Sequence, residues 1–274
     1  MKFSILLPHL RPWVLGLVKI WPAMIVKPNF AIWEVFHILA LMVLGGASII
    51  LSLRLLGAGL TEERPSELYR SLRAWLHAGV VGVVITGILI GMANAERLYD
   101  SAAFLVKIIA LIAGVVMTYG AARPMLLADG RASRGAVVAA LVALAIWGVG
   151  VLIFLTGGLI TPGLFHVVTA GALIVLCLTR GRTRIIYVAG VALILLAMFL
   201  ATHVFIAPDD LKRADPANVA LGWVMMAWVT GGAVAQVLGS RARLAEPLAP
   251  RVVGYATILI WVSAAAAGRW IAFA

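Results

Sequence analysis

Long apolar runs separated by short polar connections dominate the sequence. A helix that crosses a bilayer needs about 20 mostly apolar residues. Eight runs meet this requirement, at residues 31–53, 74–95, 103–121, 136–158, 163–180, 185–206, 217–238 and 252–273. Turn-forming or charged segments separate them, among them Thr61-Glu62-Glu63-Arg64-Pro65 and Pro208-Asp209-Asp210. The pattern predicts an all-α, polytopic membrane helix bundle with about eight transmembrane helices.

The connections are too short to hold a soluble catalytic domain, so any chemistry is expected in or at the membrane. Phe36-His37 in the first run has a counterpart in Phe165-His166 of the fifth. This similarity leaves open a 4+4 parallel repeat with halves at 31–158 and 159–274. Residues 1–30 combine Trp, Pro and basic residues without a compact apolar core, which predicts an interfacial segment on the membrane surface.

The composition excludes a water-soluble globular domain. Hydrophobic residues make up 64% of the chain and charged residues 12%, with a mean hydropathy of +1.09. Soluble domains have about 45–50% apolar and about 25% charged residues. The single cysteine, Cys177, excludes an intrachain disulfide and a covalent c-type haem site.

The position of the basic residues predicts a membrane orientation, and we expect no nucleic-acid partner despite the formal net charge of +11. Thirteen of the 22 Lys and Arg residues lie in the odd-numbered connections. This bias places the odd-numbered loops in the cytoplasm and both termini in the periplasm of a bacterial inner membrane. The basic residues of the N-terminal segment run against this orientation: Lys2, Arg11, Lys19 and Lys27.

Ionisable residues within the apolar runs are few, and such residues are usually functional. With a rise of 1.5 Å per residue, the ionisable residues of four runs lie at a similar depth, within a layer of the membrane roughly 10 Å thick near its predicted outer face. This layer contains Glu34, His37, Lys107, His166 and His203. His77 lies near the opposite end of its run beside Trp75, as expected of an interfacial residue. Arg269 lies close to the C-terminus.

Histidines at one depth on different helices are typical of a b-type haem site. We expect His37 to be one axial ligand and His166 or His203 to be the other. Glu34, one turn before His37, would orient the imidazole or transfer protons to a quinone. The basic side chains of Lys107 and Arg269 would pair with haem propionates or a quinone. The competing interpretation is that these are interfacial side chains that extend to the headgroups.

Four segments resemble three helices of a family of small uncharacterised bacterial membrane proteins with four helices. The first helix of that family is matched by Glu34-Val35-Phe36-His37 with Leu53-Arg54-Leu55-Leu56-Gly57, the third by Ala103–Lys107 and the last by Ala267–Phe273. More distantly, a His early in the first helix and a Lys opening the third are similar to CopD-type copper proteins and HemJ-type protoporphyrinogen oxidases. The HemJ-type resemblance implies haem b, with His37 as a ligand and Lys107 as an essential partner. The resemblance covers mainly residues 31–125 and 252–273.

Together these features predict an integral membrane b-type haem protein. It would bind one haem, with room for a second in the other half, and transfer electrons between a periplasmic partner and the quinone pool as a subunit of a redox complex. CopD-like copper transport across the inner membrane through the same histidines is the alternative. A third hypothesis is that the protein is a non-catalytic structural membrane subunit.

Overall fold

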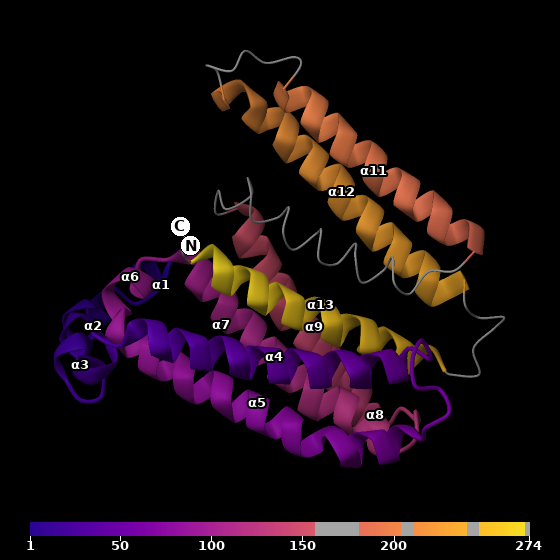
Figure 1. The fold of residues 1–274 in the computed structure, drawn as a ribbon, viewed down its shortest axis with the longest axis horizontal. Helices are drawn as coiled ribbons and strands as arrows, with labels where there is room; N and C mark the ends of the chain where they lie inside the picture. Colours follow the sequence, from indigo (N-terminus) through magenta and orange to yellow (C-terminus); the bar gives the residue numbers. More distant parts are fainter. Residues whose placement is uncertain (157–180, 204–210, 240–246, 272–274) are drawn as a thin grey trace. The chain divides into compact units, whose positions relative to one another are not determined.

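A computed structural model of the protein describes residues 1–156, 181–203, 211–239 and 247–271, and every regular element in these ranges is a helix (Figure 1). Six of these helices are long and apolar enough to cross a membrane. They are α4 (Phe30–Leu55), α5 (Pro65–Ala93), the continuous run of α7 (Ala102–Val115), η3 (Val116–Ala122) and α8 (Arg123–Leu127), then α9 (Arg134–Thr156), α11 (Gly181–His203) and α13 (Leu248–Trp270). The predicted all-α polytopic membrane bundle is confirmed, and its apolar helices contact the lipid bilayer.

The helices group into two compact units. The first contains α1–α9 and α13, and the second contains α11 and α12 (Leu211–Gly239). The sequence division at 158/159 assigned the last apolar run to the second half, whereas α13 packs on α4 and α7 of the first unit. The apolar run predicted at 163–180 lies outside the described residues.

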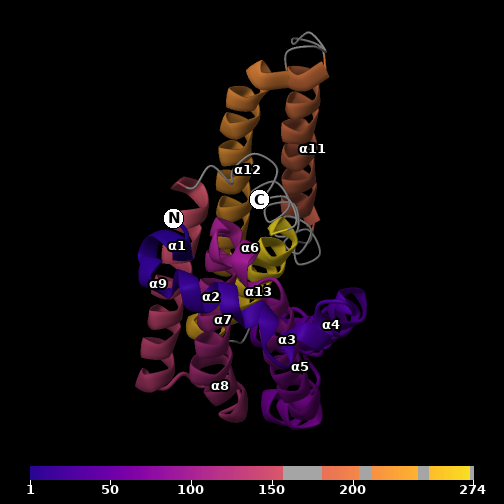
Figure 2. The ribbon, with the colours of Figure 1, turned by 90° about the vertical axis from the view of Figure 1, so that its left-hand side faces the viewer.

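An antiparallel pair, α4 and α5, forms one side of the first unit (Figures 1 and 2). A Cβ atom at Gly79 would lie 2.6 Å from the Leu44 backbone nitrogen, and one at Gly82 would lie 2.8 Å from the Ala40 Cβ atom. Glycine therefore allows the two backbones to approach closely, as is common in membrane helix pairs. The same faces continue, at the i, i+3, i+7 spacing, to Thr86 on α5 and His37 on α4.

The most buried span of the first unit is α13. It packs against α4 on one side and α7 on the other, and α7 in turn packs against α9. Two glycines permit these contacts: Gly114 faces the indole of Trp261 at 3.0 Å, and Gly254 lies 2.7 Å from the Ser52 carbonyl oxygen, both measured from an added Cβ. This packing buries a mainly apolar core that α4, α5, α7, α9 and α13 share.

Two helices begin six or more residues earlier than the hydropathy pattern predicted. The α5 helix starts at Pro65 instead of residue 74, because its first turn is stabilised independently of hydrophobicity. Proline is favoured at the first helical position, and the Asp129 carboxylate accepts a hydrogen bond of 3.0 Å from the Ser66 N–H. The α12 helix starts at Leu211 instead of residue 217 and includes Pro216, and its apolar stretch covers Ala220–Gly232.

Short helices make up the N-terminal segment: α1 (Phe3–Leu6), η1 (Pro8–Leu10), α2 (Arg11–Gly16), η2 (Leu17–Lys19) and α3 (Ala23–Val26). None is long enough to cross a membrane. The segment packs on α6 (Ala95–Tyr99), where the Tyr99 hydroxyl donates to the Leu7 carbonyl and Arg11 lies 3.5 Å from Asp100. Its exposed tryptophans, Trp13 and Trp21, are typical of a membrane interface.

The second unit is an antiparallel pair of helices, α11 and α12, held by aromatic contacts. The Trp228 Nε1–H donates to the Tyr187 carbonyl oxygen at 3.1 Å, and the two rings stack with centroids 6.1 Å apart. Glycine again stands opposite each ring, with Gly190 against Trp228 and Gly232 against Tyr187. Close packing in this unit therefore depends on the same combination of small and aromatic residues as in the first.

Candidate functional site

His37 lies between two polar partners from two other helices. Its Nδ1 atom is 2.8 Å from the Thr86 hydroxyl on α5, and its Nε2 atom is 3.2 Å from the Lys107 Nζ atom on α7. All three residues lie at the end of the first unit where α4 begins, α5 ends and α7 begins. The sequence placed His37 and Lys107 at one depth, and the structure brings their side chains into direct contact.

Donor and acceptor counting fixes the tautomer of this histidine. The Thr86 hydroxyl has one proton, which it donates to the Gly82 carbonyl oxygen at 2.5 Å. Its oxygen therefore accepts the proton carried by Nδ1 of His37. An ammonium group can only donate, so Nε2 accepts from Lys107 and carries no proton. His37 is thus a neutral imidazole whose Nε2 lone pair faces Lys107.

Small residues surround this triad. A Cβ atom at Gly87 would lie 3.4 Å from Cε1 of His37, and one at Gly268 on α13 would lie 3.4 Å from Cε and Nζ of Lys107. The side chains of His37 and Lys107 are both partly buried. A cation inside a membrane helix, paired here with a neutral imidazole, attracts negatively charged groups.

Of the other predicted site residues that the structure describes, none is recorded in this contact. Glu34 and Arg269 are exposed, at the same end of the first unit. His203 is exposed at the end of α11, where its Nδ1 atom lies 3.1 Å from the Phe199 carbonyl oxygen and its ring stacks on Phe199. His166 lies outside the described residues. The imidazole of His37, which Glu34 was expected to orient, is held at Nδ1 by Thr86.

Thr86 was missed in the sequence because a threonine in an apolar run is unremarkable by itself. The available signal was its spacing, seven residues after Gly79 and four after Gly82, on the face of α5 that approaches α4. Among the described residues, no group of three or more His, Cys, Asp or Glu side chains is arranged to hold a metal ion.

Comparison with known proteins assigns no chemistry to this site. Residues 29–162 match the sequence model of a family described as "Family of unknown function (DUF6644)". The match includes His37, Thr86 and Lys107. No curated protein and no solved structure matches the chain. The chain is therefore similar to this family over α4–α9, and its function has to be argued from the residues.

A second polar cluster lies toward the opposite end of the first unit. There η3 (Val116–Ala122) is a π-helix, a wider turn that is frequent at functional sites. Thr118 of η3 accepts a hydrogen bond of 3.1 Å from Nε1 of Trp261. The Tyr69 hydroxyl lies 3.4 Å from Nε2 of His77, whose exposed ring packs edge-on against Tyr119.

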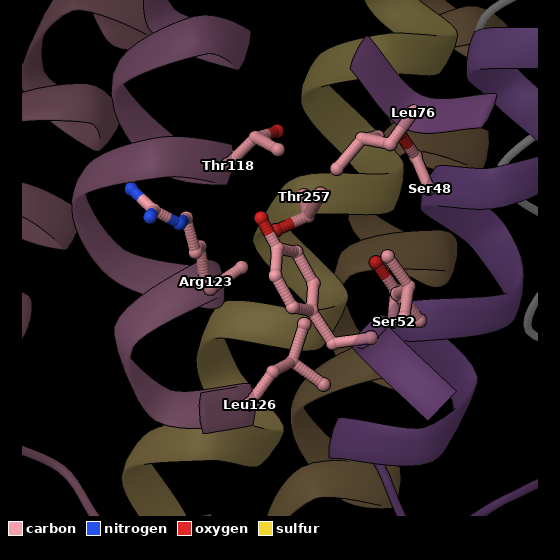
Figure 3. Close-up of a pocket in the computed structure, with 10 residues that line it drawn as sticks. Ser48, Ser52, Leu76, Thr118, Arg123, Leu126 and Thr257 are labelled. Carbon is pink, nitrogen blue, oxygen red and sulfur yellow. The ribbon is translucent and has the colours of Figure 1, made fainter. Parts of the chain in front are cut away.

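A small pocket adjoins this cluster, lined by side chains of α4, α5, η3, α8 and α13. Figure 3 shows Ser48 and Ser52 on one side and Thr118 and Thr257 facing them, with the guanidinium group of Arg123 pointing away from the serines. The enclosed space has room for about one water molecule. It is therefore too small for an organic cofactor.

Proposed function

We propose that the protein is an integral membrane b-type haem protein that carries electrons between a periplasmic partner and the quinone pool, as a subunit of a larger redox complex. The observation that carries the proposal is the orientation of His37. Thr86 holds its Nδ1–H, and Nε2 keeps its lone pair. A metal-ligating histidine typically needs such a bond at the far nitrogen, because it sets the tautomer and the ring orientation.

A single histidine ligand, His37, fits haem better than a bare metal ion. Haem brings most of the ligands of its iron with it, so the protein would have to supply only one or two side chains. A single oriented imidazole such as His37 meets this need, whereas a bare copper ion would require further side chains. When bound, haem would supply one-electron chemistry at its iron.

Lys107 has two tasks in this proposal. Its flexible side chain would rotate away from Nε2 and free the lone pair for the metal. Its ammonium group would then pair with a propionate, since a cation in this setting attracts an anion. Arg269, which directly follows the Gly268 contact of Lys107, is the second candidate for this pairing.

The proposed orientation follows from the loop charges. With the odd-numbered loops in the cytoplasm of a bacterial inner membrane, the His37 end of the helices faces the periplasm. An external electron donor could then approach the site from the side that carries the N-terminal segment.

The experiment is a comparison of haem content between two histidine variants. We expect His37→Ala to lose haem and His77→Ala, whose histidine lies in the other polar cluster, to retain it. Purified proteins would be compared by the pyridine haemochrome assay and by circular dichroism, which verifies the helical fold. Haem retained in His37→Ala but lost from His77→Ala would contradict the proposal.

A further inference from the structure

Ser48 presents a buried hydroxyl without a protein partner to the small pocket. Ser48 is 3% exposed, and its Oγ atom forms no hydrogen bond within the described part of the chain. A buried hydroxyl left unpaired is costly, and most such groups bond to protein or to ordered water. The pocket beside Ser48 has room for about one water molecule. The unpaired hydroxyl of Ser48 therefore borders a space of the size that one water molecule needs.

The hydroxyls around the pocket define what it can bind. The Thr257 hydroxyl donates to the Val253 carbonyl oxygen at 2.7 Å, so only its lone pairs are left for the pocket. Thr118 already accepts from Trp261 and has its own proton to give. Ser48 can donate or accept. The pocket thus offers both donors and acceptors.

We propose that this pocket binds one ordered water molecule, which hydrogen-bonds to Ser48, Thr118 and Thr257 and so links α4, η3 and α13. Water both donates and accepts, and matches this set. An anion would face the lone pairs of Thr257, and a cation would face the proton donor of Thr118. The widened turn of η3 supplies one wall of the site, as expected where a π-helix makes room for a ligand.

The proposed water would also extend a hydrogen-bonded chain to the helix surface. Tyr69 lines the same pocket, and its hydroxyl lies 3.4 Å from Nε2 of the exposed His77. With the Tyr69 hydroxyl as its fourth partner, the water would link the exposed His77 through Tyr69 to the buried Ser48. This site lies apart from His37 and does not depend on haem binding.

The test combines a structure with a pair of serine variants. A crystal structure of the full chain at about 2 Å resolution is expected to show one density peak within hydrogen-bond distance (about 2.7–3.2 Å) of the Ser48 Oγ atom. Crystals soaked in bromide are expected to show no anomalous signal there. Ser48→Ala should lose the peak and lower the Tm by several degrees.

Ser71→Ala is the matched control, because Ser71 is an exposed helical serine that bonds only the carbonyl four residues earlier among the contacts recorded for it. Its Tm should be unchanged. A dry pocket with a raised Tm for Ser48→Ala would overturn the proposal, since removing an unpaired buried hydroxyl then stabilises the protein. A bromide signal at the site would also overturn it, because it would identify an anion site.

Discussion

The contact between α4 and α5 positions His37 against Thr86, and it can be tested at Gly79. An alanine there would place Cβ 2.6 Å from the Leu44 nitrogen and 2.7 Å from its Cα atom. Ordinary carbon contacts are about 3.5–4.0 Å, so the two helices would have to move apart by about 1 Å. Backbone atoms cannot rotate out of the way as a side chain can.

The loss of stability caused by this clash can be measured with a matched pair of substitutions. Overpacking of this kind costs about 1–3 kcal/mol, whereas replacing a helical glycine by alanine gains about 0.5–1 kcal/mol. Gly46→Ala on α4 carries the same gain without the clash, because nothing lies within 4 Å of the added Cβ atom. The stability difference between Gly79→Ala and Gly46→Ala therefore isolates the steric cost.

The assay is reversible unfolding in mixed micelles or bicelles. We expect Gly79→Ala to be less stable than Gly46→Ala by about 1–3 kcal/mol and to bind less haem, since Thr86 would move away from His37. Equal stability of the two variants would refute the close approach of α4 and α5, and with it the geometry of the site.

Three further predictions concern single side chains. Thr86→Val should lower haem retention because it removes the acceptor that orients the imidazole, while Thr86→Ser should keep it; both are measured by haem-to-protein ratio. Hydrogen bonds from the side chain and N–H of Ser66 hold the pKa of Asp129 below its usual range. The stability that this bond contributes is therefore present above about pH 4 and lost as the pH falls, so the Tm gap between wild type and Asp129→Asn should close in acid. Trp261→Phe should cost about 0.5–1.5 kcal/mol of unfolding free energy by removing the donor to Thr118; an unchanged value would show that this bond contributes nothing.

Hydropathy predicted the six candidate spans found among the described residues, because every bilayer-crossing helix must satisfy the same length and composition rule. It failed at the start of α5, where a proline and the Asp129 carboxylate stabilise the first turn. It also could not reveal that α13 packs with α4 and α7, since which helices become neighbours depends on packing contacts such as Gly254 against Ser52.

The candidate site was predictable in part. Depth along the helices placed His37 and Lys107 at one level, but their contact also requires α4 and α7 to be neighbours, which depth does not determine. Thr86 was not identified, because its role comes from the register of α4 against α5 and not from its own residue type. The buried Ser48 and the π-helix of η3 were invisible for the same reason.

Haem in the purified protein is the most direct test of the proposed function. The measurement is a visible spectrum of the detergent-solubilised full chain, air-oxidised and then reduced with dithionite, after expression with ample haem. We predict a Soret band that sharpens on reduction, an α-band of the b type, and about one haem per chain. A colourless protein with intact helical structure would contradict the account, and copper uptake would then be the next activity to measure.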